Sequence, residues 1–180
     1  MPTAGSTLRF TVLVFLVALC SSQLALAKAV AKVPQPDLAG MIACKKSIED
    51  WQAFGRAFLE PQAIESWGWH ESQSDNGFLK TFTLDKPIVV FGERVSQIAF
   101  SGSGVVAFLK SKLLAQLVRE LKLDPIHQGP TVKLFGRLLQ TNYEKAGSST
   151  LSTKISLTAS TSPNYPGFVL AGCSYEFNVE

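Results

Sequence analysis

Charged and metal-binding residues are scarce in this chain of 180 residues. Charged side chains make up 17% of it, whereas hydrophobic residues make up 46%. This balance excludes an intrinsically disordered chain, and no heptad or Gly-X-Y repeat indicates a fibrous protein. The two histidines, His70 and His127, lie far apart, and neither has a possible ligand three or four residues further on. Zinc usually takes three or four ligands, so a metal site is not expected.

Nucleotide-binding and nucleophile motifs are also missing. The chain has no G-x-x-x-x-G-K-[S/T] phosphate loop and no G-x-G-x-x-G after a strand. Ser101-Gly102-Ser103-Gly104 lacks the spacing of a G-x-S-x-G elbow and is better explained as a turn. All basic residues except Arg9 lie beyond residue 27. That part of the chain has 16 basic and 14 acidic residues, and no basic cluster in it is larger than Lys45-Lys46. We therefore expect no nucleic acid partner, no cofactor and no enzymatic activity.

The first 27 residues have the pattern of a secretory signal. Arg9 supplies a positive charge, residues 10–20 are almost wholly apolar, and Ala25-Leu26-Ala27 matches a small-x-small cleavage site. The apolar run is shorter than the roughly 20 residues that a bilayer requires, so we expect cleavage and no stable membrane insertion. Lipidation at Cys20 is not expected, because Leu19 stands where lipidated precursors have a small residue.

Removal of the leader changes the cysteine count. Of three cysteines only Cys44 and Cys173 remain, an even number in an oxidising compartment. We predict that these two form one disulfide, which closes a loop of more than 100 residues. The alternative is a pair of buried free thiols.

Hydrophobic periodicity predicts two helices separated by strands. Ser47 and Asp50 resemble a capping box, and apolar residues then recur at helical spacing until the helix ends near Pro61. A second helix is predicted over Ser111–Leu123, and Asp124-Pro125 ends it. Strands are predicted over Trp67–Ser72, Phe78–Leu84, Ile88–Phe91, Val95–Phe100, Val105–Leu109, Val132–Thr141, Leu151–Ser160 and Phe168–Phe177.

Turn residues divide these strands. Ser74-Asp75-Asn76-Gly77 is a hairpin signal, Asp85-Lys86-Pro87 is expected to interrupt a strand, and His127 is expected in a loop rich in Pro and Gly. Ile88–Phe91 and Val95–Phe100 are either separate strands or one strand bent at Gly92.

The order of elements predicts an α+β fold made of two α-β-β-β units, with helices packed on antiparallel sheets and one disulfide. An extended leader over residues 28–43, which contains Pro34 and Pro36, precedes the first unit at 44–110 and the second at 111–180. Whether the two sheets join into one stays open at this point.

The segment from Glu65 to Glu71 combines carboxylates, indoles and an imidazole. Enzymes that hydrolyse glycosides use two carboxyl groups as their catalytic residues, here beside aromatic rings. However, nothing in the sequence buries Glu65 or Glu71 or fixes their separation. The simpler interpretation is that a tryptophan packs in the core and that the charged side chains are solvated.

Without a catalytic motif, binding through the surface is the favoured function. Aromatic and polar side chains in and beside the loops are the residue types that dominate interfaces. The candidate partner-binding residues are Trp67, Trp69, His70, Asp75, Asn76, Tyr143 and Tyr165.

The secretory signal at 1–27, the Cys44–Cys173 pair and the two α-β-β-β units together resemble periplasmic immunity and inhibitor proteins. These proteins accompany bacteria-killing type IV and type VI secretion systems. The resemblance implies a periplasmic, non-enzymatic protein that occludes a secreted effector or an envelope enzyme. It rests on architecture and assigns no functional residue. Two alternatives stay open, a carrier of an apolar small molecule or lipid, and an envelope glycan-binding protein or hydrolase.

Overall fold

Eight antiparallel strands and four helices form the part of the chain that the computed structural model describes, residues 33–73, 77–110 and 114–179. The first half contains α1 (Leu38–Ile42), α2 (Ile48–Phe58), α3 (Ala63–Ser66), β1 (Trp69–Ser72), β2 (Lys80–Val90), β3 (Glu93–Ser101) and β4 (Gly104–Leu109). The second half contains α4 (Leu114–Leu121), β5 (Asp124–Gln128), β6 (Lys133–Ala146), β7 (Ser149–Ser160) and β8 (Val169–Val179). Within these ranges no helix is long and apolar enough to cross a bilayer.

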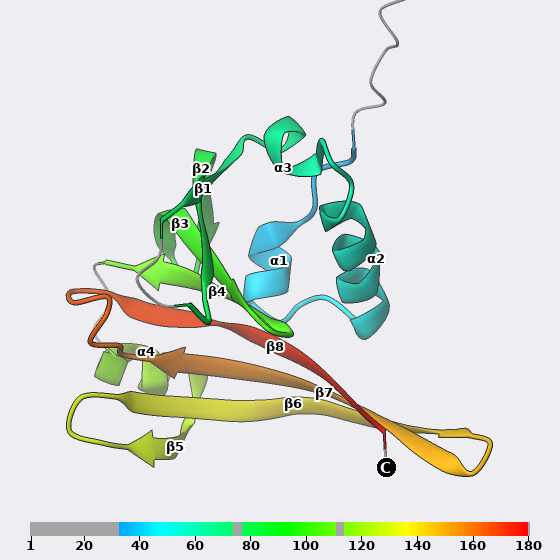
Figure 1. The fold of residues 1–180 in the computed structure, drawn as a ribbon. Helices are drawn as coiled ribbons and strands as arrows, with labels where there is room; N and C mark the ends of the chain where they lie inside the picture. Colours follow the sequence, from blue (N-terminus) through cyan, green and yellow to red (C-terminus); the bar gives the residue numbers. More distant parts are fainter. Residues whose placement is uncertain (1–32, 74–76, 111–113, 180) are drawn as a thin grey trace, which may run out of the picture. The chain divides into compact units, whose positions relative to one another are not determined.

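The strands form one sheet in the order β1-β2-β3-β4-β8-β7-β6-β5 (Figure 1). The last strand of each half therefore lies at the centre, where β4 and β8 pair from Gly104 with Ser174 to Leu109 with Val169. The predicted α+β fold, with helices beside antiparallel strands, is confirmed. Four strands rather than three follow each helical segment, and the two sets of strands join into a single sheet.

Directly paired residues show which side chains share a face of the sheet. One row crosses all eight strands in the order Glu71, Phe82, Ile98, Ala107, Ala171, Ala159, Phe135 and Pro125. Apart from its two ends, this row packs in the main hydrophobic core with Ile42 of α1, Phe54 of α2 and Leu117 of α4. We call this side the helix face. Because side chains alternate along a strand, the neighbouring row lies on the opposite side, the open face.

Aromatic rings fill the space between α2 and the first strands. The ring of Phe54 is at the centre of this group, with centroids 5.3 to 6.2 Å away in Trp51, Phe58, Trp67, Trp69 and Phe100. Such ring pairs stabilise a core by about 0.5–1.5 kcal/mol each beyond the burial of their area. The helical spacing of aromatic residues in α2 therefore reflects packing on the sheet.

The predicted start of α2 is confirmed, whereas α1 was not predicted. The Ser47 hydroxyl accepts a hydrogen bond from the Asp50 N–H at 3.2 Å, and the Asp50 carboxylate accepts one from the Ser47 N–H at 3.1 Å. Residues 28–43 were expected to be extended, but α1 lies within them, capped by Asp37, which accepts from the Gly40 N–H. A helix of five residues is too short to produce a periodic pattern.

A Schellman motif ends α1 and places Cys44 for the disulfide. The N–H of Cys44 donates to the Met41 carbonyl at 3.1 Å, and the N–H of Lys45 donates to the Gly40 carbonyl at 2.8 Å. Cys44 takes a φ of 55°, a left-handed conformation in which glycine is usual. Its sulfur is bonded to Cys173 of β8, with the two Cα atoms 5.2 Å apart. The predicted disulfide is thus confirmed, and free thiols are excluded.

One prediction between the helices was wrong, whereas the alternative of separate strands on either side of Gly92 is confirmed. Asp85-Lys86-Pro87 does not interrupt the strand, because β2 continues through it with a shift of register between Thr83 and Ile88. Pro87 lies in this irregular stretch, where its missing N–H does not interrupt the hydrogen bonds between paired strands. The chain turns instead at Phe91 and Gly92, with φ values of 51° and 76°, and enters β3 directly.

The segment after α4 is a strand rather than a loop. His127 lies in β5, an edge strand whose five residues are all exposed and which pairs with β6. The sequence did not indicate this strand, because residues 124–128 show no alternation of apolar and polar side chains and include Pro125. The helix itself ends at Leu121, inside the predicted range, and the predicted positions 111–113 lie outside the described residues.

Candidate partner-binding surface

The two tryptophans predicted as partner anchors lie in the core. Trp67 is 4% exposed and Trp69 is 3% exposed, and their ring centroids are 4.8 Å apart. The indole N–H of Trp67 donates to the carbonyl of Pro34 at 3.0 Å, which fixes the segment before α1 against the core. Both side chains therefore stabilise the fold and present no surface to a partner, which corrects their assignment as anchors.

The carboxylates of the same segment do not form a catalytic pair. Glu65 is exposed on α3 and lines a cavity with Asp85, whereas Glu71 is exposed on β1 and lines a different cavity. The Glu71 carboxylate is 3.1 Å from the Lys80 ammonium. Glycoside hydrolysis requires two carboxyl groups that flank one bond, one of them held protonated by its surroundings. This geometry gives no support to that alternative.

His70 points away from the tryptophans because it is the next residue along β1. Its ring lies on the open face, where its Nε2 is 2.8 Å from an Asp85 carboxylate oxygen. Both side chains are about two-thirds exposed, at 65% and 60%, so water screens their attraction. Among the described residues, no three His, Cys, Asp or Glu side chains converge on a common point.

The remaining predicted residues are spread over the sheet. Tyr165 lies between β7 and β8, half-buried, with its ring edge-on to Phe108 at 4.9 Å. Tyr143 lies near the far end of β6 and is 66% exposed. Asp75 and Asn76 lie outside the described residues. The structure thus leaves Tyr143 as the large, well-exposed aromatic side chain among the described members of this set.

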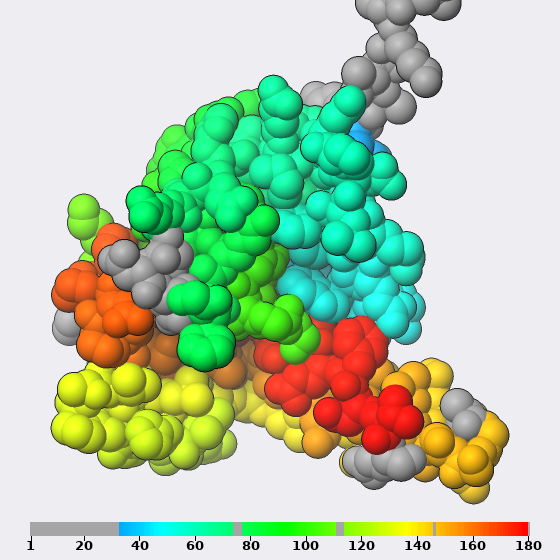
Figure 2. Space-filling model, viewed as in Figure 1, coloured from blue at the N-terminus to red at the C-terminus, as the bar shows by residue number. Residues whose placement is uncertain are grey.

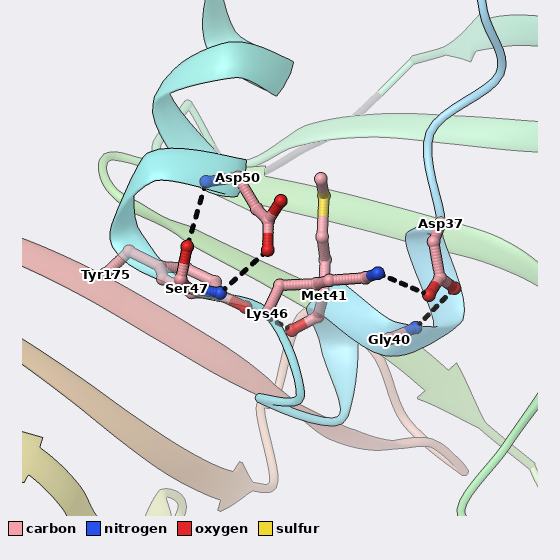
Figure 3. A network of polar contacts seen from close by, with 7 residues as sticks. All are labelled: Asp37, Gly40, Met41, Lys46, Ser47, Asp50 and Tyr175. Atoms are coloured by element: carbon pink, nitrogen blue, oxygen red, sulfur yellow. Dashed lines mark hydrogen bonds and ion pairs between the residues drawn. The ribbon is translucent and has the colours of Figure 1, made fainter.

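The polar network at the start of the fold is structural (Figure 3). The Lys46 ammonium is 2.9 Å from the Asp37 carboxylate, and this contact, followed by the Gly40 N–H, lowers the pKa of Asp37. The Tyr175 hydroxyl donates to the Met41 carbonyl at 2.9 Å. Burial, with a smaller effect from two nearby carboxylates, raises the pKa of Tyr175 well above its usual value. Each of these groups has a partner, and together they hold α1 against β8.

One apolar cavity lies beside α2. It measures about 330 Å³ and is lined by Pro34, Pro36, Met41, Phe54 and Trp67, among others. Cavities that enclose a small-molecule ligand measure about 300–1,000 Å³, so this one is at the lower limit. The space between α2 and the sheet is filled by rings and does not extend it. This geometry therefore gives little support to the alternative that the protein carries an apolar small molecule or lipid.

The open face carries one row of mostly small side chains and, at its centre, a second buried cluster in which Ala99, Phe108 and Leu170 pack with Tyr165 and Phe168. The row next to the core row runs across the eight strands through Ser72, Thr81, Ala99, Val106, Gly172, Thr158, Gly136 and Asp124. Most of these residues are smaller or more polar than their neighbours on the helix face. Helices do not cover this row, since α1, α2 and α4 all contribute to the core of the other face.

The strands β6, β7 and β8 continue into a projecting arm, which we define as residues 139–146, 149–154 and 176–179 (Figure 1). Among the described strands, β5 pairs with β6 only as far as Gly136, and β4 pairs with β8 only as far as Ser174. The arm is therefore a three-stranded ribbon with two open edges. Figure 2 shows it standing out beyond the surface of β8.

Both faces of the arm carry exposed apolar side chains. Tyr143, 66% exposed, lies opposite Ser152 on the open face, and Leu138 beside the arm is 58% exposed. Phe177 and Val179, at 38% and 75%, continue the helix face beyond the last helix. Isolated apolar residues are ordinary on a surface, but a ribbon that combines such residues with unpaired strand edges is typical of an interface. The sequence predicted Tyr143 as a candidate binding residue but did not indicate Leu138, Phe177 or Val179.

No protein-family model, no curated protein and no solved structure matches the chain.

Proposed function

We propose that the mature chain is an exported, non-enzymatic binding protein of the immunity or inhibitor type. It binds a secreted effector or an envelope enzyme through the arm and covers that partner's active site. The observation that carries this proposal is the arm itself, a ribbon with exposed apolar side chains and unpaired edges.

The arm offers a partner two kinds of interaction. Burial of the side chains of Tyr143 and Val179 would remove apolar area from water, which contributes about 25 cal/mol for each Å². The free edge of β6 over 139–146 would pair with an extended segment of the partner, in the manner of β-strand addition. A projecting ribbon also enters a cleft more readily than a flat surface does, as occlusion of an active site requires.

The disulfide supports the proposed compartment. Cys44 and Cys173 are bonded in a chain that begins with a secretory pattern, and such bonds persist outside the reducing cytoplasm. We propose that the mature protein works in the periplasm, where an inhibitor would meet an effector directed at the envelope.

We also propose that the chain consists of two α-β units of similar design. Each helical segment is followed by a four-stranded meander, and the last strands of the two meanders pair at the centre. A substitution that widens the β4–β8 pairing should therefore uncouple the two halves. A sheet that folds as one undivided body would instead lose stability throughout.

The binding proposal is tested by capture from an envelope extract of the organism that encodes the chain. The oxidised mature protein is immobilised, and wild type is compared with Tyr143→Ser. The matched control is Leu59→Ser, because Leu59 is 81% exposed but follows α2, outside the arm. Loss of a central anchor typically costs 1–2 kcal/mol or more, so Tyr143→Ser should reduce retention about tenfold while Leu59→Ser does not.

The captured protein must also be inhibited. Its activity should fall to near zero at one equivalent of wild-type chain and recover when Tyr143→Ser is used instead. Equal retention by the two variants would contradict the role of the arm. A partner that stays fully active in the complex would contradict inhibition while leaving binding in place.

A further inference from the structure

A partly buried arginine, Arg137, lies at the base of the arm. β5 pairs with β6 only as far as Gly136, so Arg137 is the first residue of β6 beyond that pairing. It stands opposite Leu157, which packs in the main hydrophobic core, and its side chain therefore lies on the helix face. Arg137 thus marks the point at which the free edge of β6 begins.

The guanidinium of Arg137 has no partner within the described residues. Its Nε is enclosed by protein and makes no hydrogen bond there, and none of the ion pairs that these residues form includes it. Lys46 is also partly buried, but its ammonium is 2.9 Å from the Asp37 carboxylate. A partly buried charge without a partner has lost hydration and gained no interaction in exchange, which is unfavourable for the free protein.

The end of this guanidinium is available to a partner. Nε is enclosed, whereas the two Nη amino groups of the same side chain reach the surface. A carboxylate binds an arginine in a bidentate manner either through Nε and one Nη or through both Nη groups. Here the second arrangement is open. Because enclosure of Nε fixes the direction of the group before binding, little side-chain entropy is lost when a carboxylate is bound.

The two faces of the free edge differ in chemistry. Gln140 and Glu144 follow Arg137 on the helix face. Leu138 and Tyr143 lie on the open face and are exposed. A strand added to this edge alternates its side chains between the same two faces. It would place apolar residues on the open face and polar residues on the helix face, and its polar residue nearest β5 would lie beside Arg137.

We infer that Arg137 binds a carboxylate of the partner, an aspartate or glutamate on an extended segment that pairs with the free edge of β6. Both Nη groups donate to this carboxylate, and the other polar residues of the segment lie along the helix face towards Glu144. Backbone pairing at the edge selects a polypeptide, so the anion is a carboxylate of a protein rather than a phosphate. The inference rests on the proposed function, because it names the chemistry of the segment that the arm binds.

The first test selects a displayed library of short linear peptides on the immobilised mature chain with its disulfide intact. Peptides retained by wild type but not by Tyr143→Ser are those that need the arm. They should alternate apolar and polar residues and carry Asp or Glu at one end of the polar set. The same selection on Arg137→Glu should enrich Lys or Arg at that position instead. The matched control is Arg94→Glu, because Arg94 is exposed on β3, outside the arm, and its peptides should keep the acidic residue.

The second test measures the single contact. One selected peptide is synthesised with its acidic residue and with the corresponding amide, and both are titrated into the protein by calorimetry. The amide should bind wild type about tenfold more weakly or worse, because a charge-assisted pair of hydrogen bonds is lost. Arg137→Met keeps an apolar stem and removes the guanidinium, so it should bind the two peptides with equal affinity.

Arg137→Met also reports on the fold. Since the guanidinium has no partner within the described residues, its removal should leave the midpoint of urea unfolding unchanged or raise it. A large decrease in the midpoint would show that the guanidinium stabilises the free protein, and this would contradict its role as an anchor for a partner.

Other results would also overturn the inference. They are arm-dependent peptides without an acidic preference, the same acidic preference on Arg137→Glu, and the absence of any peptide that needs the arm. Failure of the proposed function has a different signature. A captured envelope protein that stays active contradicts inhibition, whereas the change of peptide preference on Arg137→Glu does not depend on that activity.

Discussion

Gly172 occupies the pairing that joins the two halves of the sheet, and its replacement by alanine gives the sharpest test of the fold. A Cβ atom built on Gly172 would lie 2.6 Å from the Cα of Val106 and closer still to the carbonyl oxygen of Val105. These are main-chain atoms, so no side-chain rotation relieves the contact and β4 must move away from β8. Overpacking of a tight interior costs about 1–3 kcal/mol and sometimes more. Because the collision is with backbone, we expect Gly172→Ala to cost about 3 kcal/mol or more.

Gly55 supplies a control of opposite sign. It lies within α2, and a Cβ atom there would meet nothing within 4 Å. Alanine is more favourable than glycine inside a helix by about 0.8–1.0 kcal/mol, so Gly55→Ala should stabilise the protein. Urea unfolding followed by far-ultraviolet circular dichroism gives both values from the shift in midpoint at constant slope.

The same experiment tests the two-unit organisation. All three tryptophans, Trp51, Trp67 and Trp69, lie in the first half, whereas circular dichroism reports on both halves. If β4–β8 joins two units, the fluorescence and dichroism transitions of Gly172→Ala should separate. Coincident transitions with a large loss of stability would contradict two units. A change below about 0.5 kcal/mol would refute the steric argument itself, since that is the size of an ordinary surface substitution.

Two further predictions concern the contacts that hold α1 to β8. Replacing Cys44 and Cys173 together by serine should lower the free energy of unfolding by about 5 kcal/mol, because the bridge spans 129 residues of the unfolded chain. A loss below about 1 kcal/mol in urea would contradict this. Tyr175 is buried with a raised pKa, whereas an unfolded tyrosine ionises near pH 10. Its contribution to stability is therefore complete below about pH 10 and decreases by about 1.4 kcal/mol per pH unit above it. Unfolding measured on both sides of that pH should show a shallower decline for Tyr175→Phe, and an equal decline would exclude Tyr175 as its source.

Features encoded by neighbouring residues, or by the number of residues of one type, could be predicted from the sequence. The start of α2 depends on Ser47 and Asp50, three positions apart, and on apolar side chains one turn apart, so the whole signal lies within a dozen residues. The disulfide followed from counting the cysteines that remain beyond the leader. Both features need no knowledge of which distant segments meet.

Features that depend on distant contacts could not be predicted. One of Trp67 and Trp69 was expected in the core while both were also named as candidate anchors, and only the position of α2 above β1 decides that both are buried. The left-handed residues Cys44 and Lys122 carry no glycine signal, yet each forms part of a Schellman motif at a helix end. There the hydrogen bonds to the last turn outweigh the cost of about 1–2 kcal/mol for a non-glycine residue.

The arm could not be predicted from the sequence as a candidate binding site. The predicted strands ended at Thr141 and began again at Leu151, because the residues between them, apart from Tyr143, are polar or small. In the structure Gly147, with a φ of 65°, makes a tight turn, and pairing continues as far as Ala146 with Ser149. Strand structure in this stretch is therefore imposed by the partner strand rather than by local preference.

The edges of the sheet differ in a way that supports the arm as the interface. Natural sheets protect their edges by making them short or by placing proline and bulges there. β1 has only four residues, and β5 has five with Pro125 among them. The edge of β6 over 139–146 is longer and contains no proline, and its one irregularity lies at its base, between Leu138 and Gln140. Glu144 and Lys145 place charges on this edge, but shortness and proline, the devices found at both ends of the sheet, are missing from it, as expected if that edge meets a partner.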